Sequence, residues 1–357
     1  MSTKLLIAAS GTGGHLFPAI ATAEQLATDC QVEWLGVPDR LETKLVPACY
    51  PLHTISVEGF QGKPGLGTLK TLGKLLVAII KVRQLLQRGQ FRSVFTTGGY
   101  IAAPAIIAAR SLGLPAILHE ANALPGKVTR FLSPWCSTVA LGFAEAAQFL
   151  PRAKTVMVGT PVRSQFFQPP PLDLPIAEGV PLLVVVGGSQ GAVVVNQLVR
   201  ACVPAWVEAG IWVVHLTGEN DPDALSLSHP RYFPLPFFDN MAALLHRADL
   251  AVSRAGAGTL TELAIAQTPA ILIPYPFAAD DHQTYNARVF AAAGAALLHQ
   301  QSDLTAHQLQ QEVLDLLGGT HGNCRKTLDD MKAATASLAV TDSATRLATL
   351  ILQSFSG

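Results

Sequence analysis

The chain has 357 residues, 49% of them hydrophobic and 14% charged, and its formal net charge is zero. This length suits two domains of ordinary size, and the charge balance argues against nucleic acid as a main partner. The 5 cysteines are scattered without a CxxC pair, which favours reduced thiols over a disulfide framework or a zinc site. No stretch of about 18 apolar residues occurs, and the apolar run 4–9 is too short for a signal peptide. We therefore expect neither a membrane span nor a leader.

Short apolar runs alternate with longer helical patterns along the chain, which predicts parallel sheets with crossover helices. The strands expected in the first half are 5–9, 32–35, 54–57, 94–97, 116–119, 139–141 and 156–158. A proline-rich stretch at 159–175 then interrupts the pattern. In the second half we expect a helix after each of the strands 182–186, 213–216, 250–253, 271–273 and 296–298.

The two series predict an α/β protein with two Rossmann-like, doubly wound parallel-sheet domains, residues 1–160 and 161–340. We expect a cleft between these domains, lined by the carboxyl ends of the strands and by glycine turns. A last helix at about 341–357 is expected to pack back on the first domain.

The first strand leads into the glycine turn SGTGGH at residues 10–15. A dinucleotide-binding fingerprint would need a glycine where Leu16 stands and an acidic residue closing the second strand, which ends instead at Gly36. We therefore disfavour NAD. A tight turn that exposes N–H groups to a phosphate remains, and His15 at its edge is either a helix cap or a general base for a sugar hydroxyl.

The segment 65–88 is predicted to form one helix with a basic side and an apolar side. The basic side holds Lys70, Lys74, Lys81 and Arg88, and the apolar side holds Leu72, Leu75, Leu76, Ile79, Val82 and Leu86, widened by Leu66, Leu69 and Ile80. Two interpretations stay open. The helix either packs on the core with a solvated basic side, or forms a patch that enters a membrane while its lysines meet anionic headgroups.

Two further polar turns follow strands of the first half. One reads TGGY at 97–100, and the other reads HEANALPGKVTR at 119–130. Glu120 and Asn122 are expected either to point into the cleft or to cap a helix. The pair His-Glu has no second histidine four residues on, so it is no metalloprotease motif.

The second half opens with the glycine turn GGSQG at 187–191, before a helix. Ser189 and Gln190 could donate hydrogen bonds to a phosphate, or the turn could simply pack strand against helix. No GK[ST] follows any of the glycine turns, so ATP hydrolysis is disfavoured. No cluster of metal ligands is apparent.

The stretch 253–286 combines three features that suit a nucleotide sugar. A strand turns through residues 255–258 into a helix whose N-terminus favours an anion. Glu262, about one turn inside, can accept hydrogen bonds from ribose hydroxyls. The loop 274–283 ends in side chains that fit a sugar edge, namely Asp280, Asp281, His282, Gln283 and Asn286. The plainer interpretation is a capped helix and a polar turn.

With these residues the chain closely resembles the MurG family, the N-acetylglucosamine transferases that act on lipid-linked N-acetylmuramyl-pentapeptide in bacterial peptidoglycan synthesis. The matching blocks are GTGGHLFPA (11–19), TGGYIAAPA (97–105), HEANALPGK (119–127), GTPVR (159–163), GGSQGA (187–192), FFDNMAA (237–243), SRAGAGTLTE (253–262) and DDHQTYNA (280–287). The chain departs from the family pattern at Ser10, where a further glycine is usual, at Ala121, which replaces glutamine, and at Thr160, which replaces asparagine.

The resemblance implies a GT-B fold whose second domain binds the donor, UDP-GlcNAc. The positions expected to meet the donor are Thr12, Gly13, Gly14, Asn122, Arg163, Ser189, Gln190, Phe238, Ala257, Gly258, Thr259, Glu262, Gln283 and Asn286. Among them, Ser189 would contact the diphosphate, Glu262 the ribose and Gln283 the GlcNAc hydroxyls, while the backbone at Phe238 would read the uracil edge. No cofactor and no protein-held divalent metal are expected.

The first domain is expected to bind the acceptor, undecaprenyl-diphosphate-linked MurNAc-pentapeptide. Its contacts would be Gly11, Gly13, Gly14, His15, Thr97, Gly98, Gly99 and Tyr100. His15 is the expected base for the muramyl C4 hydroxyl in a single inverting displacement that forms lipid II, with Glu120 in reserve. The resemblance also favours the membrane interpretation of Leu72, Leu75, Leu76, Ile79, Lys70, Lys74 and Lys81. It implies a peripheral protein at the cytoplasmic face of the inner membrane, with an anionic membrane surface and cell-wall synthesis proteins as further partners.

Three alternatives remain at this point. The chain could be another GT-B glycosyltransferase with a diacylglycerol acceptor, or a UDP-GlcNAc epimerase with the same two-domain design. From a different class comes a non-catalytic scaffold that binds a nucleotide sugar at the membrane. The requirement for an acceptor and the release of UDP distinguish these alternatives.

Overall fold

The structure, a computed structural model, describes residues 3–57, 66–188, 192–318 and 322–356. It divides into two compact units, residues 1–163 with 342–357 and residues 164–341. These boundaries lie close to the predicted ones at 160 and 340. The first is unit 1 and the second is unit 2.

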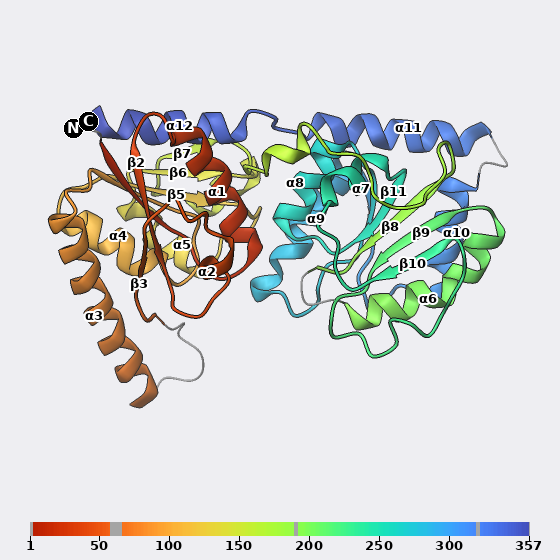
Figure 1. Ribbon diagram of the computed structural model, residues 1–357, viewed down its shortest axis with the longest axis horizontal. Helices are drawn as coiled ribbons and strands as arrows, with labels where there is room; N and C mark the ends of the chain where they lie inside the picture. Colours follow the sequence, from red (N-terminus) through yellow and green to blue (C-terminus); the bar gives the residue numbers. More distant parts are fainter. Residues whose placement is uncertain (1–2, 58–65, 189–191, 319–321, 357) are drawn as a thin grey trace. The chain divides into compact units, whose positions relative to one another are not determined.

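The centre of unit 1 is a seven-stranded sheet in the order β3-β2-β1-β4-β5-β6-β7 (Figure 1). Its strands are β1 (Lys4–Ala8), β2 (Gln31–Gly36), β3 (Leu52–Thr54), β4 (Ser93–Thr96), β5 (Ala116–Glu120), β6 (Thr138–Leu141) and β7 (Thr155–Met157). Neighbouring strands are parallel, so their carboxyl ends meet at one edge of the sheet. The glycine turns of the first half follow β1 and β4 at that edge.

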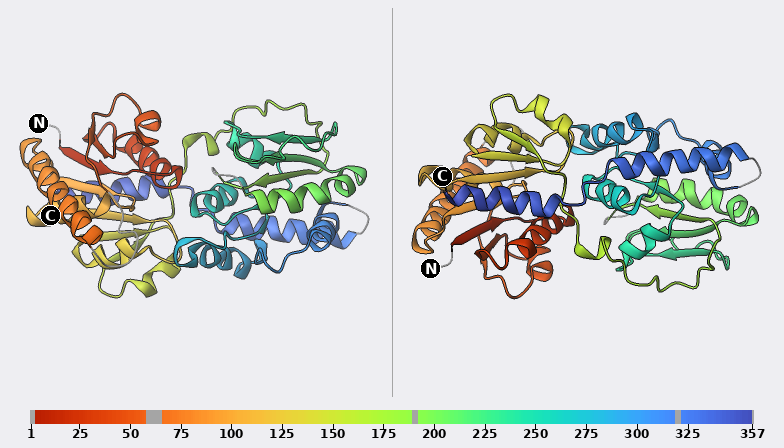
Figure 2. Two further views of the ribbon diagram at one scale, coloured as in Figure 1. Left: turned by 90° about the horizontal axis from the view of Figure 1, so that it is seen from below. Right: turned by 90° about the horizontal axis from the view of Figure 1, so that it is seen from above.

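Helices cover both faces of this sheet (Figure 2). They are α1 (Gly13–Leu26), α2 (Glu42–Leu45), α3 (Leu66–Arg88), α4 (Ala102–Ser111), α5 (Lys127–Leu132) and α12 (Ser343–Gln353), with 3-10 turns η1 (Ser133–Trp135), η2 (Ala144–Phe149) and η5 (Ser354–Ser356). Side chains of β1 alternate between two cores. Leu6 and Ala8 join the cluster that contains α3 and α4, whereas Leu5 and Ile7 join the cluster that contains α1 and α12.

Unit 2 has a six-stranded parallel sheet in the order β10-β9-β8-β11-β12-β13. Its strands are β8 (Leu182–Val186), β9 (Trp212–Leu216), β10 (Tyr232–Leu235), β11 (Leu250–Ser253), β12 (Ala270–Leu272) and β13 (Ala296–Leu298). Its helices are α6 (Val193–Glu208), α7 (Met241–Arg247), α8 (Ala257–Ala266), α9 (His282–Ala292), α10 (Ala306–Leu317) and α11 (Gly322–Ser337), with 3-10 turns η3 (Ser164–Phe166) and η4 (Ala279–Asp281).

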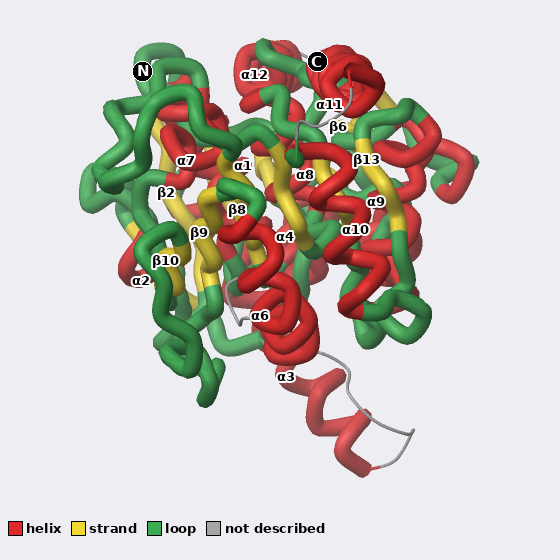
Figure 3. Tube along the Cα trace, turned by 90° about the vertical axis from the view of Figure 1, so that its right-hand side faces the viewer, coloured by secondary structure: helices red, strands yellow, loops and turns green. Residues whose placement is uncertain are grey.

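The strands form the inner layer and the helices the outer layers (Figure 3). All five residues of β8 are buried, because a central parallel strand packs helices on both faces. This burial explains why β8 is a continuous apolar run rather than an alternating one.

Two predictions about strands were wrong in detail. The strand expected at 54–57 is β3, Leu52–Thr54, while Ile55 and Val57 are buried in the core just beyond it. The strand expected at 213–216 is not followed by a helix but by a loop and β10, which pairs with β9 at the edge of the sheet. Pro234 hid β10 in the sequence, because proline lacks an N–H and is tolerated only in an edge strand.

Candidate active site

His15 lies in the first turn of α1, directly against the turn at 97–100. Its Nδ1 is 2.7 Å from the carbonyl oxygen of Thr97, and the Thr97 hydroxyl donates to the His15 carbonyl at 2.9 Å. A carbonyl can only accept, so Nδ1 carries the hydrogen and Nε2 of the neutral ring is left as a proton acceptor. The half-buried imidazole is therefore oriented as a general base should be.

Gly98 and Gly99 form the wall opposite this imidazole. Their φ angles are +94° and +72°, which side chains rarely adopt. A Cβ added to Gly98 or Gly99 would lie 3.5 or 3.7 Å from a ring atom of His15. Tyr100 completes the turn with 44% of its surface exposed. The structure thus brings together two segments about eighty residues apart that were both predicted to bind the acceptor.

The first glycine turn is held by a residue that the sequence analysis missed. Glu42 is completely buried, and its carboxylate accepts hydrogen bonds from the N–H of Gly11 at 3.3 Å and of Val37 at 2.7 Å. The N–H of Gly11 is therefore engaged within the protein, and contact with a phosphate at this turn falls to the next three residues. Of these, Thr12 and Gly14 are exposed. A glutamate on a short helix gave no signal in the sequence, because only the folded chain places it beneath the turn.

Glu120, the reserve candidate for the base, is engaged by its own loop, and its role as a base stays a prediction. The side chain is 6% exposed, and one carboxylate oxygen accepts from both the backbone and the side-chain nitrogen of Asn122, each at 3.0 Å. The other oxygen accepts from the N–H of Gly126 at 3.2 Å. Glu120 therefore shapes its own loop and orients Asn122, which stays half-buried at the carboxyl end of the sheet.

Arg163, expected to reach the donor, lies at the end of unit 1. Its guanidinium carbon is 4.6 Å from the centre of the Phe17 ring on α1, close enough for a cation–π contact. The half-buried side chain is thereby fixed beside the helix that carries His15.

In unit 2, a buried arginine supports the turn that leads into α8. Arg254 donates to the carbonyls of Ile273 and Pro274, both at 3.0 Å, and to the side chain of Gln301 at 2.7 Å. These bonds connect the end of β11 to the loop after β12. Gly256 caps α8, so the N–H groups at Ala257, Gly258 and Thr259 form the start of the helix, as an anion site requires.

Two residues expected to contact the donor sugar contribute mainly to this turn. The side-chain oxygen of Gln283 accepts from the N–H of Ala255 at 3.2 Å and of Tyr275 at 2.9 Å. Contact with a sugar therefore falls to its amide nitrogen. Asn286 is fully buried and donates to the Ala255 carbonyl at 3.1 Å, so it supports the turn, and its predicted contact with the donor stays a prediction.

The structure describes only some of the remaining positions that are expected to contact the donor. Glu262 is half-buried in the second turn of α8, and Phe238 is half-buried in the loop 236–240 that follows β10. Ser189 and Gln190 lie outside the described residues, so their predicted contacts stay predictions.

Helix α3 exposes a different apolar row from the predicted one. Ile79 is partly buried against the core and Leu75 is half-buried, because this side of the helix packs on α4. The exposed row consists of Leu72 (45%), Leu76 (55%), Val77 (52%) and Ile80 (55%). Lys81 is exposed beside it and Lys74 is half-buried, while the side chain of Lys70 lies outside the described residues.

The described part of the chain contains neither a cluster of metal ligands nor a helix that could span a membrane. No group of three or more His, Cys, Asp or Glu side chains gathers there as a metal site would. None of the helices in these residues combines the length and apolar character needed to span a membrane.

Known proteins resemble the chain over nearly its whole length. The glycosyltransferase family 28 N-terminal domain matches residues 5–141, and the C-terminal domain of that family matches residues 182–347. A relative from Trichormus variabilis, named UDP-N-acetylglucosamine--N-acetylmuramyl-(pentapeptide) pyrophosphoryl-undecaprenol N-acetylglucosamine transferase, is 65% identical over 351 residues, which cover 98% of this chain and 97% of the relative. A relative of the same name from Trichodesmium erythraeum is 62% identical over 348 residues, which cover 98% of this chain and 91% of the relative. The chain belongs to the MurG family of glycosyltransferases.

A solved structure agrees with this assignment. The crystal structure of Acinetobacter baumannii MurG has a TM-score of 0.79 and 30% sequence identity, covering 98% of this chain and 99% of that one. Membership in the MurG family confirms the predicted GT-B fold class, and the parallel sheets of the two units agree with it. It also confirms the prediction that the chain is a glycosyltransferase.

Proposed function

We propose that this chain transfers GlcNAc from UDP-GlcNAc to the C4 hydroxyl of MurNAc in undecaprenyl-diphosphate-linked MurNAc-pentapeptide. The observation that carries this proposal is the 65% identity, over 98% of the chain, to a relative named for that transfer. The oriented imidazole of His15 supplies the chemical group that such a transfer needs.

The reaction is a single inverting displacement. Nε2 of His15 accepts the proton of the C4 hydroxyl while that oxygen attacks the anomeric carbon of GlcNAc. The bond between the anomeric carbon and the UDP oxygen breaks, and UDP leaves with the electron pair. The product is a β-1,4-linked disaccharide, and no covalent enzyme intermediate forms.

The negative charge on UDP is stabilised by the N-terminus of α8. The N–H groups at residues 257–259 point out of the helix start, and the helix dipole adds a partial positive charge there. Glu262 accepts hydrogen bonds from the ribose, the backbone at Phe238 reads uracil, and the amide nitrogen of Gln283 contacts GlcNAc. We propose that no protein-held metal is required for this step.

We also propose that the protein is peripheral at the cytoplasmic face of the plasma membrane, where an anionic lipid surface and cell-wall synthesis proteins are its partners. The exposed row on α3 supports this, because four large apolar side chains in water beside Lys81 suit insertion among anionic lipids. The first turns of α3 extend away from the rest of unit 1 (Figures 1 and 3).

The membrane proposal predicts a loss of lipid binding when this row is made polar. Replacing Leu76→Ser and Ile80→Ser together should weaken binding to vesicles of anionic phospholipid by about tenfold or more, since each buried CH₂ contributes about 0.8 kcal/mol. Co-sedimentation measures the effect. Leu225→Ser, at a leucine that is 84% exposed in unit 2, is the matched control and should bind as the wild type does. Equal binding by all three proteins would contradict the proposal.

The activity itself is tested by UDP release from purified protein given UDP-GlcNAc and a short-chain analogue of the lipid acceptor. The transferase releases UDP only with the acceptor and yields the lipid-linked disaccharide. An epimerase would convert UDP-GlcNAc without acceptor, a scaffold would bind it without releasing UDP, and a different glycolipid transferase would require diacylglycerol instead.

A further inference from the structure

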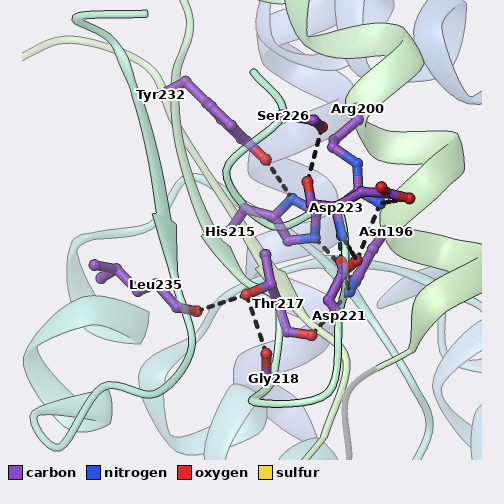
Figure 4. A network of polar contacts seen from close by, with 10 residues as sticks. All are labelled: Asn196, Arg200, His215, Thr217, Gly218, Asp221, Asp223, Ser226, Tyr232 and Leu235. Atoms are coloured by element: carbon purple, nitrogen blue, oxygen red, sulfur yellow. Dashed lines mark hydrogen bonds and ion pairs between the residues drawn. The ribbon is translucent and has the colours of Figure 1, made fainter. Parts of the chain in front are cut away.

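Unit 2 contains a closed network of buried polar side chains that the proposed reaction does not use (Figure 4). We call it the His215 network. Its members are Asn196 and Arg200 of α6, His215 of β9, Asp221 of the loop between β9 and β10, and Tyr232 of β10. Asn196 and His215 are fully buried, Tyr232 is 4% exposed and Asp221 is 8% exposed. A polar cluster this deep in a core would destabilise the unit unless its members were satisfied by one another.

The direction of each hydrogen bond in the network follows from its neighbours. The side-chain nitrogen of Asn196 donates to the carbonyl of Thr217 at 2.8 Å and to the carboxylate of Asp221 at 2.6 Å, and both of these can only accept. The oxygen of Asn196 therefore faces Nε2 of His215, 3.0 Å away, which must carry the hydrogen. Nδ1 of His215 is left to accept from the Tyr232 hydroxyl at 2.9 Å.

An ion pair closes the other end of the network. Arg200 donates to one carboxylate oxygen of Asp221 at 2.7 Å and to the other at 3.3 Å. Burial raises the pKa of the Asp221 carboxyl, but the hydrogen bonds from Arg200 and Asn196 outweigh that effect and hold the pKa below its usual value. Burial, aided by the charge of Arg200, lowers the pKa of His215 to about 3, so the imidazole stays neutral.

The network joins segments that lie at the carboxyl edge of the sheet. Asn196 belongs to the first turn of α6, where its N–H donates to the carbonyl of Ala192 at 2.8 Å. Its side chain holds the carbonyl of Thr217, just after β9. Thr217 in turn donates its N–H to the carbonyl of Leu235 at 2.9 Å. Leu235 ends β10 and leads into the loop 236–240, which carries Phe238.

We propose that the His215 network positions the uridine diphosphate site by setting the distance between the first turn of α6 and the loop 236–240. This inference rests on the proposed function, which places the uracil at Phe238. The network residues act through their neighbours and not by touching the nucleotide, because both sides of the Asn196 amide and both nitrogens of His215 already bond within the network. We therefore call them positioning residues.

Binding of UDP to the full-length protein tests this inference. Asn196→Leu keeps the branching of the side chain but removes every hydrogen bond of the amide. We expect it to weaken UDP binding about tenfold, equivalent to about one lost buried hydrogen bond. Tyr232→Phe removes only the hydroxyl that donates to His215 and should weaken binding about threefold. The KM for UDP-GlcNAc should rise in parallel, while kcat stays within about twofold.

The matched control lies at the opposite edge of the same sheet. Asp249 accepts from the N–H of Leu182 at 2.9 Å and pairs with Arg247 and Lys332, both at 3.4 Å. Asp249→Asn should lower the melting temperature without changing UDP affinity, because the amino edge of the sheet is remote from the turns.

The outcomes separate the inference from the proposed function. Wild-type UDP affinity in folded Asn196→Leu or in Tyr232→Phe would overturn the inference, and so would an equal loss of affinity in Asp249→Asn. If Asn196→Leu does not fold, Tyr232→Phe decides. A wild-type protein that binds no UDP would instead contradict the proposed function on which the inference rests.

Discussion

His15 and His215 are both histidines, but their surroundings differ in burial and in hydrogen bonding. His15 is half-buried and donates one hydrogen bond, from Nδ1 to the Thr97 carbonyl, which leaves Nε2 as an acceptor. His215 is fully buried, and both of its nitrogens bond to side chains of the same unit. The difference shows that a histidine is ready for proton transfer only when one of its ring nitrogens stays unengaged.

The largest expected effect comes from His15. His15→Ala should lower turnover by two or more decades, since general base catalysis contributes about that much. UDP binding should stay nearly intact, because the proposed diphosphate, ribose and uracil contacts belong to unit 2. Steady-state kinetics and UDP titration measure the two quantities. His53→Ala is the control, because His53 pairs with Glu33 beside Lys4 at the start of β1. A comparable loss of turnover and of UDP affinity in His15→Ala would refute the role of base.

The second effect concerns the pH dependence of stability. The folded-state pKa of His215, about 3, lies below its ordinary value of 6.5, so the unfolded chain binds the proton first. The contribution of His215 to the free energy of unfolding is therefore fully present above pH 6.5 and falls as the pH drops toward 3. We expect a loss of about 2 kcal/mol between pH 7 and 5.

Urea unfolding at pH 7 and pH 5 measures this loss, and His215→Gln is the comparison because glutamine does not titrate. The variant should be less stable than the wild type at pH 7 but should lose about 2 kcal/mol less between the two pH values. Identical pH dependence in both proteins would show that His215 is accessible to protons and that its network is not closed.

The smallest expected effect concerns Glu42, which holds the glycine turn beside His15. Glu42→Gln replaces one acceptor oxygen by an amide that faces a backbone N–H, which should cost about 1–2 kcal/mol of stability. The KM for the lipid acceptor should rise more than the KM for UDP-GlcNAc, because Glu42 holds Gly11, which is expected to contact the acceptor and not the donor. A rise in the donor KM alone would contradict this assignment.

Much of the fold follows from the sequence, because strands such as β8 are long apolar runs and glycine turns mark where they end. The proximity of His15 to residues 97–100 could be expected as well, since β1 and β4 are parallel neighbours whose carboxyl ends meet. What escaped prediction depends on distant side chains that bond after folding. Glu42 and the His215 network belong to this class, and so does the bond from the Asn286 amide to the Ala255 carbonyl.

A sequence motif also does not show which of its polar groups already form hydrogen bonds within the protein. Glu120 and Gln283 were predicted to act on the substrates through a carboxylate and an amide. In the structure, backbone N–H groups donate to both carboxylate oxygens of Glu120 and to the amide oxygen of Gln283. Apolar periodicity likewise placed Ile79 in the membrane patch of α3, although contact with α4 draws it toward the core and leaves Val77 and Ile80 exposed.

The most direct test of the central claim is the anomeric configuration of the product, determined by NMR after reaction of UDP-GlcNAc with the lipid acceptor analogue. A single displacement assisted by His15 predicts a β-1,4-linked disaccharide that forms at the same rate as UDP is released. An α-linked product, or UDP release that yields free GlcNAc instead of the disaccharide, would contradict it.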